Sequence, residues 1–256
     1  MDTVKLILTD LDGTLFHDDK SISPLTKQTI LDAQKKGVLF GISTSRALVN
    51  AVRYLDGITP DIAITNGGGL VLFNNEKIYS FEFSVQDTRR LIDSCFRIFG
   101  DDIIISIDNE KSLYSNADED EFGDRYWTYS DFKNFDESAM KICIQTQDGQ
   151  KVQELADSFG KDKIDLLPFS DIPWFKLSRK DATKDNAIKA LGSKLNIPLE
   201  QIVSFGDDFN DIGMLQVCGI GVAMANAIPE VKQTADQTCK SNNEDGVAHW
   251  IIQNIL

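Results

Sequence analysis

The sequence lacks the features that mark several common protein classes. Its 256 residues include only four cysteines, and no two of them stand in a CxxC pair. This scarcity disfavours a disulfide framework or a cysteine-based zinc site. No apolar run reaches the length that spans a bilayer, and the first residues lead directly into a charged, strand-like segment, unlike a signal peptide. We therefore expect a cytoplasmic protein whose thiols are reduced.

Basic residues are also in short supply. Lys and Arg number 26 against 40 Asp and Glu, which gives a formal net charge of -14. A surface with this balance repels phosphate backbones and anionic lipid, so we expect neither a nucleic-acid nor a membrane partner. Small anionic substrates stay open, because a metal ion and a few cations can invert the potential inside a cleft.

Short apolar runs alternate with amphipathic helices at both ends of the chain. Ser23 and Pro24 have the residue types of an N-cap and a first helical position, and they predict a helix that ends near Gly37. The alternation predicts an α/β fold, a Rossmann-like doubly wound parallel sheet with helices on both faces. Ligands of such sheets bind beyond the carboxyl ends of the strands. Strands are predicted at 4–9, 38–42, 61–65, 201–205 and 220–224, and further helices at 47–55, 185–195, 211–217, 229–235 and 246–256.

The middle of the chain has a different pattern. A hairpin is predicted at residues 70–81. Further along the chain, the acidic run at 118–121 is expected to open a helix. The pattern predicts an α+β unit rich in antiparallel strands, inserted between two parts of one core. We expect the core to comprise residues 1–81 and 181–256, and the insertion residues 82–180. Within the insertion, helices are predicted at 85–99 and 150–159, and strands at 103–107, 113–115, 141–146, 163–167 and 174–178.

Two carboxylates follow the first predicted strand. Residues 10–15 read DLDGTL, which places Asp10 and Asp12 just past the carboxyl end of that strand, with Gly13 to permit a tight turn. One carboxylate can attack phosphorus and hold a metal, while the other donates a proton to the leaving oxygen. Asp and Gly are also common in ordinary turns, so a bare DxD pair would favour a structural role. The longer string DLDGTL is more specific evidence for a catalytic role.

A second group of acids follows the strand predicted at 201–205. Residues 204–211 read SFGDDFND, with acidic and amide side chains gathered at the start of a helix. Helix capping would account for some of them. Four such side chains in five residues exceed what capping needs, and magnesium takes oxygen ligands of this kind. We expect Asp207 to meet the Asp10 carboxylate across adjacent strands.

The two strings together resemble the haloacid dehalogenase superfamily, and more narrowly its Cof-type phosphatases. The cap of those enzymes is an α+β insertion in the middle of the chain, so the resemblance implies that residues 82–180 form a substrate-specificity cap. It covers nearly the whole chain, because further motifs follow in the family's order. These are ISTSR at 42–46, Asn66-Gly67, DATKD at 181–185, AMANA at 223–227 and NEDGV at 243–247.

The resemblance implies a role for each motif residue. Asp10 would be the nucleophile and a Mg²⁺ ligand, and Asp12 the general acid and base, with its backbone carbonyl on the metal. Asp207 would be a direct ligand of the metal, and Asp211 a ligand or a partner of the ligands. Thr44 and Lys184 would act on the transferring phosphoryl group. The remaining substrate- or phosphate-binding candidates are Arg46, Asn66, Gly67 and Asn210; Asn210 would hold either Asp211 or the phosphate, or act as a local cap.

The roles of three aromatic residues of the insertion can be interpreted in two ways. Trp127, Phe169 and Trp174 could contact a substrate, but aromatic side chains of this size more often pack in a core, so core packing is our expectation.

The predicted function is that of a Mg²⁺-dependent phosphatase. It would hydrolyse small phosphorylated metabolites, such as sugar phosphates, through an aspartyl-phosphate intermediate. One alternative on the same scaffold is a sugar phosphomutase resembling the phosphomannomutases. Another is a ligand-binding relative without catalytic activity, although clustered carboxylates without a metal are electrostatically costly. The natural substrate and the oligomeric state stay open.

Overall fold

The structure is a computed structural model that describes residues 4–110, 112–117, 127–160, 162–169 and 172–256. The chain divides into two compact units. The first, which we call the core unit, comprises Met1–Tyr79 and Thr183–Leu256. The second, which we call the cap unit, comprises Ser80–Ala182.

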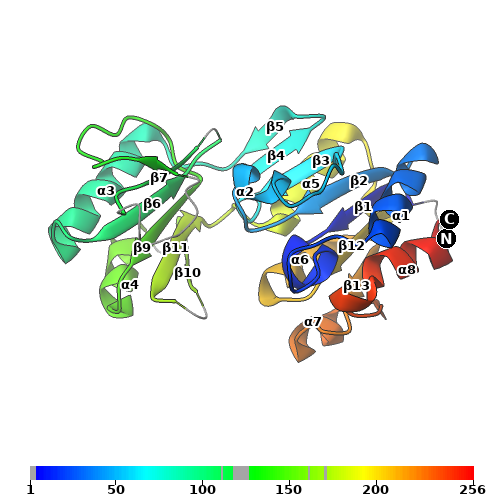
Figure 1. The fold of residues 1–256 in the computed structure, drawn as a ribbon. Coiled ribbons are helices and arrows are strands. Elements are labelled where there is room, and N and C mark those ends of the chain that lie inside the picture. The colour runs from blue at the N-terminus through cyan, green and yellow to red at the C-terminus, as the bar shows by residue number, and fades with distance from the viewer. Residues whose placement is uncertain (1–3, 111, 118–126, 161, 170–171) are drawn as a thin grey trace. The chain divides into compact units, whose positions relative to one another are not determined.

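The core unit is built on one eight-stranded sheet in the order β14-β13-β12-β1-β2-β3-β4-β5 (Figure 1). The strands from β14 to β3 run parallel, and β4 is antiparallel to β3. The predicted α/β fold is therefore confirmed. The strands are β1 (Leu6–Thr9), β2 (Leu39–Ser43), β3 (Ile62–Thr65), β4 (Leu70–Phe73), β5 (Glu76–Ser80), β12 (Ile202–Gly206), β13 (Ile220–Ala223) and β14 (Gln237–Thr238).

Helices cover both faces of this sheet (Figure 1). Leu6 and Leu8 of β1 belong to one apolar cluster with Ile188 of α5. On the other face, the Phe205 ring of β12 meets the Trp250 ring of α8 at a centroid distance of 5.3 Å. The helices are α1 (Pro24–Lys35), α2 (Leu48–Val52), α5 (Lys184–Leu195), α6 (Ile212–Val217), α7 (Pro229–Thr234) and α8 (Gly246–Asn254).

Local sequence signals account for several boundaries. The Ser23 hydroxyl accepts a hydrogen bond from the Thr26 backbone N–H at 3.0 Å, and Pro24 opens α1, as predicted. Between β4 and β5, Asn74 and Asn75 both have positive φ, 50° and 65°. Two such residues in succession form the turn that matches the twist of a two-residue hairpin, so the predicted hairpin is confirmed.

The cap unit has a six-stranded sheet in the order β10-β11-β9-β6-β7-β8. Its pairs are antiparallel except β7 with β8. Leu91 of α3 and Leu155 of α4 pack with Ile107 in one apolar cluster, so these helices cover one face of the sheet. The elements are α3 (Val85–Phe99), α4 (Gly149–Ser158), β6 (Ile104–Asp108), β7 (Leu113–Ser115), β8 (Thr128–Tyr129), β9 (Lys141–Gln145), β10 (Ile164–Pro168) and β11 (Trp174–Arg179).

Some details differ from the sequence prediction. The two-residue strands β8 and β14 were not predicted, because two residues carry no readable periodicity. The expectation of core packing is wrong for Phe169, whose side chain is 43 % exposed. Trp174, in contrast, is buried. The helix predicted to begin at residues 118–121 lies outside the described residues.

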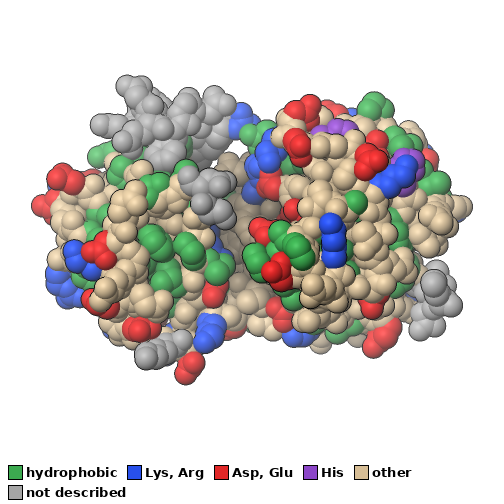
Figure 2. Space-filling model, turned by 90° about the horizontal axis from the view of Figure 1, so that it is seen from below, with side chains coloured by type: hydrophobic (Ala, Val, Ile, Leu, Met, Phe, Trp, Pro, Cys, Tyr) green, Lys and Arg blue, Asp and Glu red, His purple; other side chains and the backbone are tan. Residues whose placement is uncertain are grey.

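Two surface observations bear on partners. None of the described helices is long and apolar enough to cross a bilayer. On the face in Figure 2, Lys and Arg side chains of the described residues lie scattered among Asp and Glu side chains.

Candidate active site

The site begins where β1 ends. All four residues of β1 are buried, and the strand delivers Asp10 to the carboxyl edge of the sheet. The Asp10 backbone N–H donates to the Phe205 carbonyl at 3.0 Å, which ties it to the end of the neighbouring strand β12. The chain then turns sharply through residues 11–15, with Gly13 at φ 74°. Asp10 is therefore held, largely buried, beside the loop that follows β12.

Gly13 allows the loop after β1 to approach Asp207. A Cβ atom at this position would lie 2.3 Å from Asp207 Oδ2, so only glycine fits here without movement of the carboxylate. The next residue uses this closeness, because Thr14 Oγ1 donates a hydrogen bond to Asp207 Oδ1 at 2.5 Å. The loops after β1 and β12, nearly 200 residues apart in the chain, thus meet at one carboxylate.

Lys184 connects two of the acids. It is the first residue of α5, whose N-cap is Thr183, and its side chain is buried. Its Nζ donates to Asp10 Oδ1 and to Asp211 Oδ1, both at 2.6 Å. A buried ammonium group needs compensating charge, and here two carboxylates supply it.

Asp211 has partners on both carboxylate oxygens. Oδ1 accepts from Lys184, and Oδ2 accepts from the backbone N–H groups of Asp207 at 2.9 Å and Asp208 at 3.2 Å. Gly206 leaves room for this side chain, because a Cβ there would lie 2.4 Å from the Asp211 Cβ. Asp211 therefore fixes both the turn after β12 and the position of Lys184.

Burial sets the proton affinities of the cluster. Desolvation raises the pKa of Asp10 to about 8, opposed by the charge of Lys184 and reinforced by Asp211. Desolvation likewise raises the pKa of Asp207 to about 6, although the hydrogen bond from Thr14 opposes it. Burial alone would lower the pKa of Lys184, but Asp10 and Asp211 outweigh it and hold the pKa above its ordinary value. The cluster has more negative than positive charge.

Three of these carboxylates fit a divalent cation. Asp10, Asp207 and Asp211 each offer an oxygen, and these oxygens all lie within 4.8 Å of one another. Hard cations such as Mg²⁺ prefer oxygen ligands, and a cation here would relieve the excess negative charge. The Asp12 side chain is not in this group; the metal role expected for Asp12 uses its backbone carbonyl instead.

The Asp12 side chain binds two cations. Arg46 donates from Nε to Oδ2 at 2.6 Å and from Nη2 to Oδ1 at 2.7 Å, and Lys20 Nζ donates to Oδ1 at 2.7 Å. Partial burial would raise the pKa of Asp12, but the hydrogen bonds from Arg46 and Lys20 hold it below its ordinary value. In this arrangement Asp12 is an ionised carboxylate, the form that accepts a proton.

Backbone hydrogen bonds join the loops after β2 and β3. The Gly67 N–H donates to the Thr44 carbonyl at 2.9 Å, and the Asn66 N–H donates to the Arg46 carbonyl at 2.8 Å. Thr44 and Asn66 are both buried. Since Arg46 also binds Asp12, the structure connects these four residues to the loop after β1.

Asn210 lies differently from one sequence expectation. Its side chain is exposed and donates from Nδ2 to Ser45 Oγ at 2.9 Å, so Ser45 rather than Asp211 is its partner. The expectation that Asn210 holds Asp211 is wrong, because the Asn210 amide donates to Ser45, whereas Asp211 accepts from Lys184 and from two backbone N–H groups.

Sequence reasoning missed three contributors. The DLDGTL string by itself gives Thr14 no separate role, although Thr14 binds Asp207. No sequence motif marks Lys20. Its contact with Asp12 depends on the path of the loop, in which Lys20 has a φ of 66°. Asn226, in the quoted AMANA segment, donates to the Gly13 carbonyl at 2.7 Å and so supports the turn.

The fold and the site together define a class of protein: an α/β enzyme with clustered carboxylates and a buried lysine at the carboxyl edge of a parallel sheet. A family model described as haloacid dehalogenase-like hydrolase matches residues 7–251. The chain belongs to the haloacid dehalogenase-like hydrolase family, and the resemblance inferred from the sequence is confirmed.

Similar proteins cover almost the entire chain. The Bacillus subtilis protein YxeH is 30% identical over 273 residues, covering 98% of both chains. The B. subtilis enzyme named 5-amino-6-(5-phospho-D-ribitylamino)uracil phosphatase YcsE is 27% identical over 254 residues, covering 97% of this chain and 96% of its own. A solved structure from Thermotoga maritima superposes with a TM-score of 0.86 at 21% identity, covering 99% and 98%, and shows the same fold. The chain is thus a phosphatase-type hydrolase.

Proposed function

We propose that the chain is a Mg²⁺-dependent phosphatase that transfers a phosphoryl group from a small metabolite to Asp10 and then to water. The observation that carries the proposal is the position of Lys184, buried between Asp10 and Asp211. With Asp207 nearby, this arrangement gathers a nucleophile, a cation and oxygen ligands in one place.

The metal would be held by side chains of the core unit. Asp10 and Asp207 would bind it directly, and Asp12 would add its backbone carbonyl. When bound, Mg²⁺ would neutralise charge on the phosphoryl oxygens. Because both oxygens of Asp211 already accept hydrogen bonds, Asp211 would position Lys184 and the turn after β12.

Asp10 would act as the nucleophile. Lys184 binds its Oδ1, which leaves Oδ2 to form the bond to phosphorus. The ester P–O bond breaks, and the leaving oxygen takes a proton from Asp12. Water then attacks the phosphorus of the aspartyl phosphate and gives a proton to Asp12, and the P–O bond to Asp10 breaks.

Asp12 would change its partners during this cycle. The hydrogen bonds from Arg46 and Lys20 favour its ionised form, which suits the water step but not the donation step. A phosphoryl group would compete for Arg46 and so favour protonation of Asp12 before ester cleavage. Thr44, Asn66 and Gly67, in the loops bonded to one another and to Arg46, would hold the phosphoryl oxygens.

We propose that the substrate is a small phosphorylated metabolite. We also propose that the protein acts in the cytoplasm. The name of the relative YcsE identifies a phosphorylated ribityl compound as its substrate. Sugar and sugar-alcohol phosphates are therefore the first compounds to assay. The excess of acidic residues disfavours phosphate groups that belong to nucleic acids.

Phosphate release from p-nitrophenyl phosphate tests the proposal. Asp10→Asn should lower Mg²⁺-dependent release by on the order of a thousandfold or more, because the amide is a poor nucleophile. Asp19→Asn, at an exposed aspartate of the following loop, should leave the rate unchanged.

Other outcomes would point elsewhere. Undiminished turnover by Asp10→Asn would rule out the assigned nucleophile. A requirement for a sugar bisphosphate without net phosphate release would identify a phosphomutase. Absence of both turnover and Mg²⁺ binding would identify a ligand-binding relative without catalysis.

A further inference from the structure

Two segments that the sequence marks as motifs have no part in the chemistry proposed above. AMANA follows β13, and NEDGV leads into α8. Both belong to the core unit, and both lie beside the loop after β1, which carries Asp12. The contacts of Asn226, in the first segment, and of Asn242, just before the second, show how this loop is held.

The loop that contains Asn226 is bonded to the turn after β12. The Met224 N–H donates to the Gly206 carbonyl at 3.1 Å, and the Ile228 N–H donates to the Asp207 carbonyl at 3.0 Å. Asn226 stands midway between these two donors in the chain. Its backbone is therefore held close to the residue whose carboxylate would bind the metal.

Asn226 connects this loop to Gly13. Its Nδ2 donates to the Gly13 carbonyl at 2.7 Å, and its Oδ1 accepts from the Asn242 N–H at 3.0 Å. The Gly13 carbonyl can only accept, and the Asn242 N–H can only donate. The two partners therefore fix the orientation of the Asn226 amide.

Asn242 holds the end of the same stretch of chain. Its side chain is buried, and its Nδ2 donates to the Phe16 carbonyl at 3.0 Å and to Asp18 Oδ1 at 2.9 Å. The Phe16 N–H in turn donates to the Leu11 carbonyl at 2.8 Å. Residues 11–16, which we call the β1 turn, are thus bonded from outside at their middle and at their end.

The β1 turn needs support from outside because glycine lies at its centre. Asp12 (φ -76°, ψ 123°) and Gly13 (φ 74°, ψ 0°) have the backbone angles of a type II turn. Glycine adopts many other angles at little cost, so the local sequence alone does not fix this geometry. The Asp12 and Gly13 carbonyls belong to consecutive peptide units. A hydrogen bond that holds the second carbonyl therefore restricts the first.

We propose that Asn226, oriented by Asn242, is a positioning residue of the active site. By holding the Gly13 carbonyl it would keep the Asp12 carbonyl where Mg²⁺ binds. Asn226 itself would touch neither the metal nor the substrate and would act through the β1 turn. This inference rests on the proposed phosphatase function, because it concerns the metal of that reaction.

Titration calorimetry with Mg²⁺ tests the proposal. Asn226→Ala should bind Mg²⁺ at least about tenfold more weakly than the wild-type protein, because one ligand loses its fixed orientation. Asn254→Ala is the matched control. It removes another exposed asparagine, whose Nδ2 donates to the Trp250 carbonyl at 2.8 Å in α8, and should leave the Kd unchanged. Equal affinity of Asn226→Ala and the wild-type protein would overturn the proposal.

Phosphatase kinetics separate this role from a general loss of structure. With p-nitrophenyl phosphate, the Mg²⁺ concentration that gives half the maximal rate should rise in Asn226→Ala by the same factor as the Kd. Excess Mg²⁺ should restore most of kcat, because the metal then occupies its site. A lower kcat at every Mg²⁺ concentration, with an unchanged half-saturating concentration, would contradict a role in metal binding.

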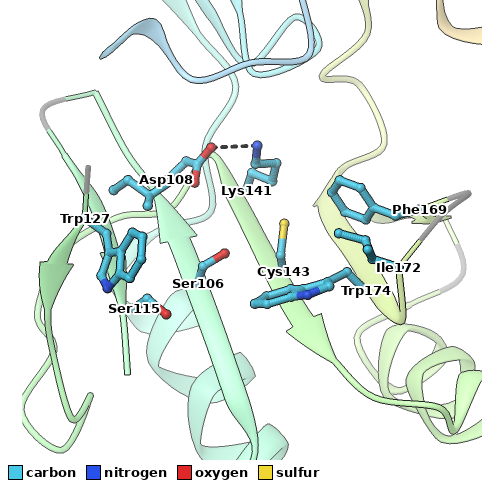
Figure 3. A pocket seen from close by; sticks show the side chains of 10 residues that line it. Ser106, Asp108, Ser115, Trp127, Lys141, Cys143, Phe169, Ile172 and Trp174 are labelled. Carbon is cyan, nitrogen blue, oxygen red and sulfur yellow. Dashed lines mark ion pairs between the residues drawn. The ribbon is translucent and has the colours of Figure 1, made fainter. Parts of the chain in front are cut away.

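Hydrogen exchange of the metal-free protein tests the β1 turn directly. Asn226→Ala should speed exchange at the Thr14 and Phe16 amides by at least about threefold, since the turn loses an outside hydrogen bond. The cap sheet is the internal reference. There Asp108 of β6 pairs with Lys141 of β9, whose Nζ lies 2.7 Å from Asp108 Oδ2 (Figure 3). Exchange in these two strands should not change.

The two levels of failure are distinguishable. A wild-type protein that neither binds Mg²⁺ nor releases phosphate would refute the proposed function, and with it the metal role of Asn226. A wild-type protein that does both, with Asn226→Ala equal to it in Mg²⁺ affinity or in exchange of the β1 turn, would refute only the positioning role. Asn226 is exposed, and urea unfolding of both alanine variants checks that each one folds.

Discussion

Lys184 organises the site through a single buried charge. Its ammonium group lies between Asp10 and Asp211, each 2.6 Å away, with almost no exposure to solvent. Without it, two carboxylates would face each other in a medium where charge is poorly screened. The lysine therefore serves the stability of the fold as well as the chemistry that we propose.

Replacing this lysine should reveal both roles. Lys184→Met should lower the free energy of unfolding by about 3 kcal/mol, because the buried carboxylates lose their partner, and should abolish turnover. Lys189→Met removes an exposed lysine of the same helix, paired with Asp185 at 2.7 Å, and should cost less than about 1 kcal/mol. Urea unfolding of both variants checks this. Equal losses of unfolding free energy in the two variants would show that the buried charge of Lys184 does not stabilise the fold more than an exposed lysine does.

Binding of Mg²⁺ should depend on pH. Metal binding requires ionised carboxylates, but burial raises the pKa of Asp10 to about 8 and that of Asp207 to about 6. Affinity should thus rise with pH through this range and level off above about 8, with release of protons on binding. Titration calorimetry near pH 6 and near pH 9, in buffers of different ionisation enthalpy, measures both. A constant Kd without proton release would contradict the expectation.

At the scale of the element, the start of α5 determines where Lys184 lies. Thr183 caps the helix by accepting from the Asn186 N–H, and its hydroxyl donates to Asp185 Oδ1 at 2.6 Å. The loop after β3 packs against the same place, because a Cβ on Gly68 would lie 2.2 Å from the Thr183 carbonyl oxygen. Loss of the Thr183 helix N-cap should therefore shift the position of Lys184.

Removal of this cap should affect both stability and rate. Thr183→Ala should cost about 1 kcal/mol of unfolding free energy and should also lower kcat, because Lys184 is the next residue. Thr183→Ser should restore most of both. Ser23→Ala removes the cap of α1 and should cost a similar free energy while leaving kcat unchanged. If both alanine variants keep full kcat, α5 does not position the lysine.

Most elements could be predicted because their signals are local. Helix α3 was predicted with its observed bounds, since Ser84 caps it and Gly100 ends it with a φ of 91°. The pairing of Asp108 with Lys141 could not be predicted. It depends on the register between β6 and β9, which are more than 30 residues apart in the chain.

At the scale of the whole molecule, the two hydrophobic clusters described above belong to different units. Ile144 belongs to the cluster under α3 and α4 of the cap unit, and Ile188 belongs to a cluster of the core unit. Each cluster draws its members from its own unit. We therefore expect each unit to be able to lose structure by itself.

Single core substitutions should act within one unit. Ile144→Ala should destabilise the cap unit by about 2–5 kcal/mol through a cavity, and Ile188→Ala should do the same to the core unit. Hydrogen exchange followed by mass spectrometry should show lost protection confined to peptides of the altered unit. Equal loss in both units would indicate one cooperative molecule.

The sequence by itself determined the fold class, the family and the carboxylates of the site. These follow from strand–helix alternation and from two short strings, because the motif acids stand directly after strands whose carboxyl ends share one edge.

Only the tertiary structure decided what those acids touch. The loop path after β1 gave Asp12 two cations, and the register in the cap sheet joined Asp108 to Lys141. The turn after β12 supplied donors to one oxygen of Asp211, and Lys184 supplied a donor to the other. Residue type sets which groups can ionise or donate. Their pKa values and partners depend on distance and burial, which are fixed only when segments remote in the chain pack together.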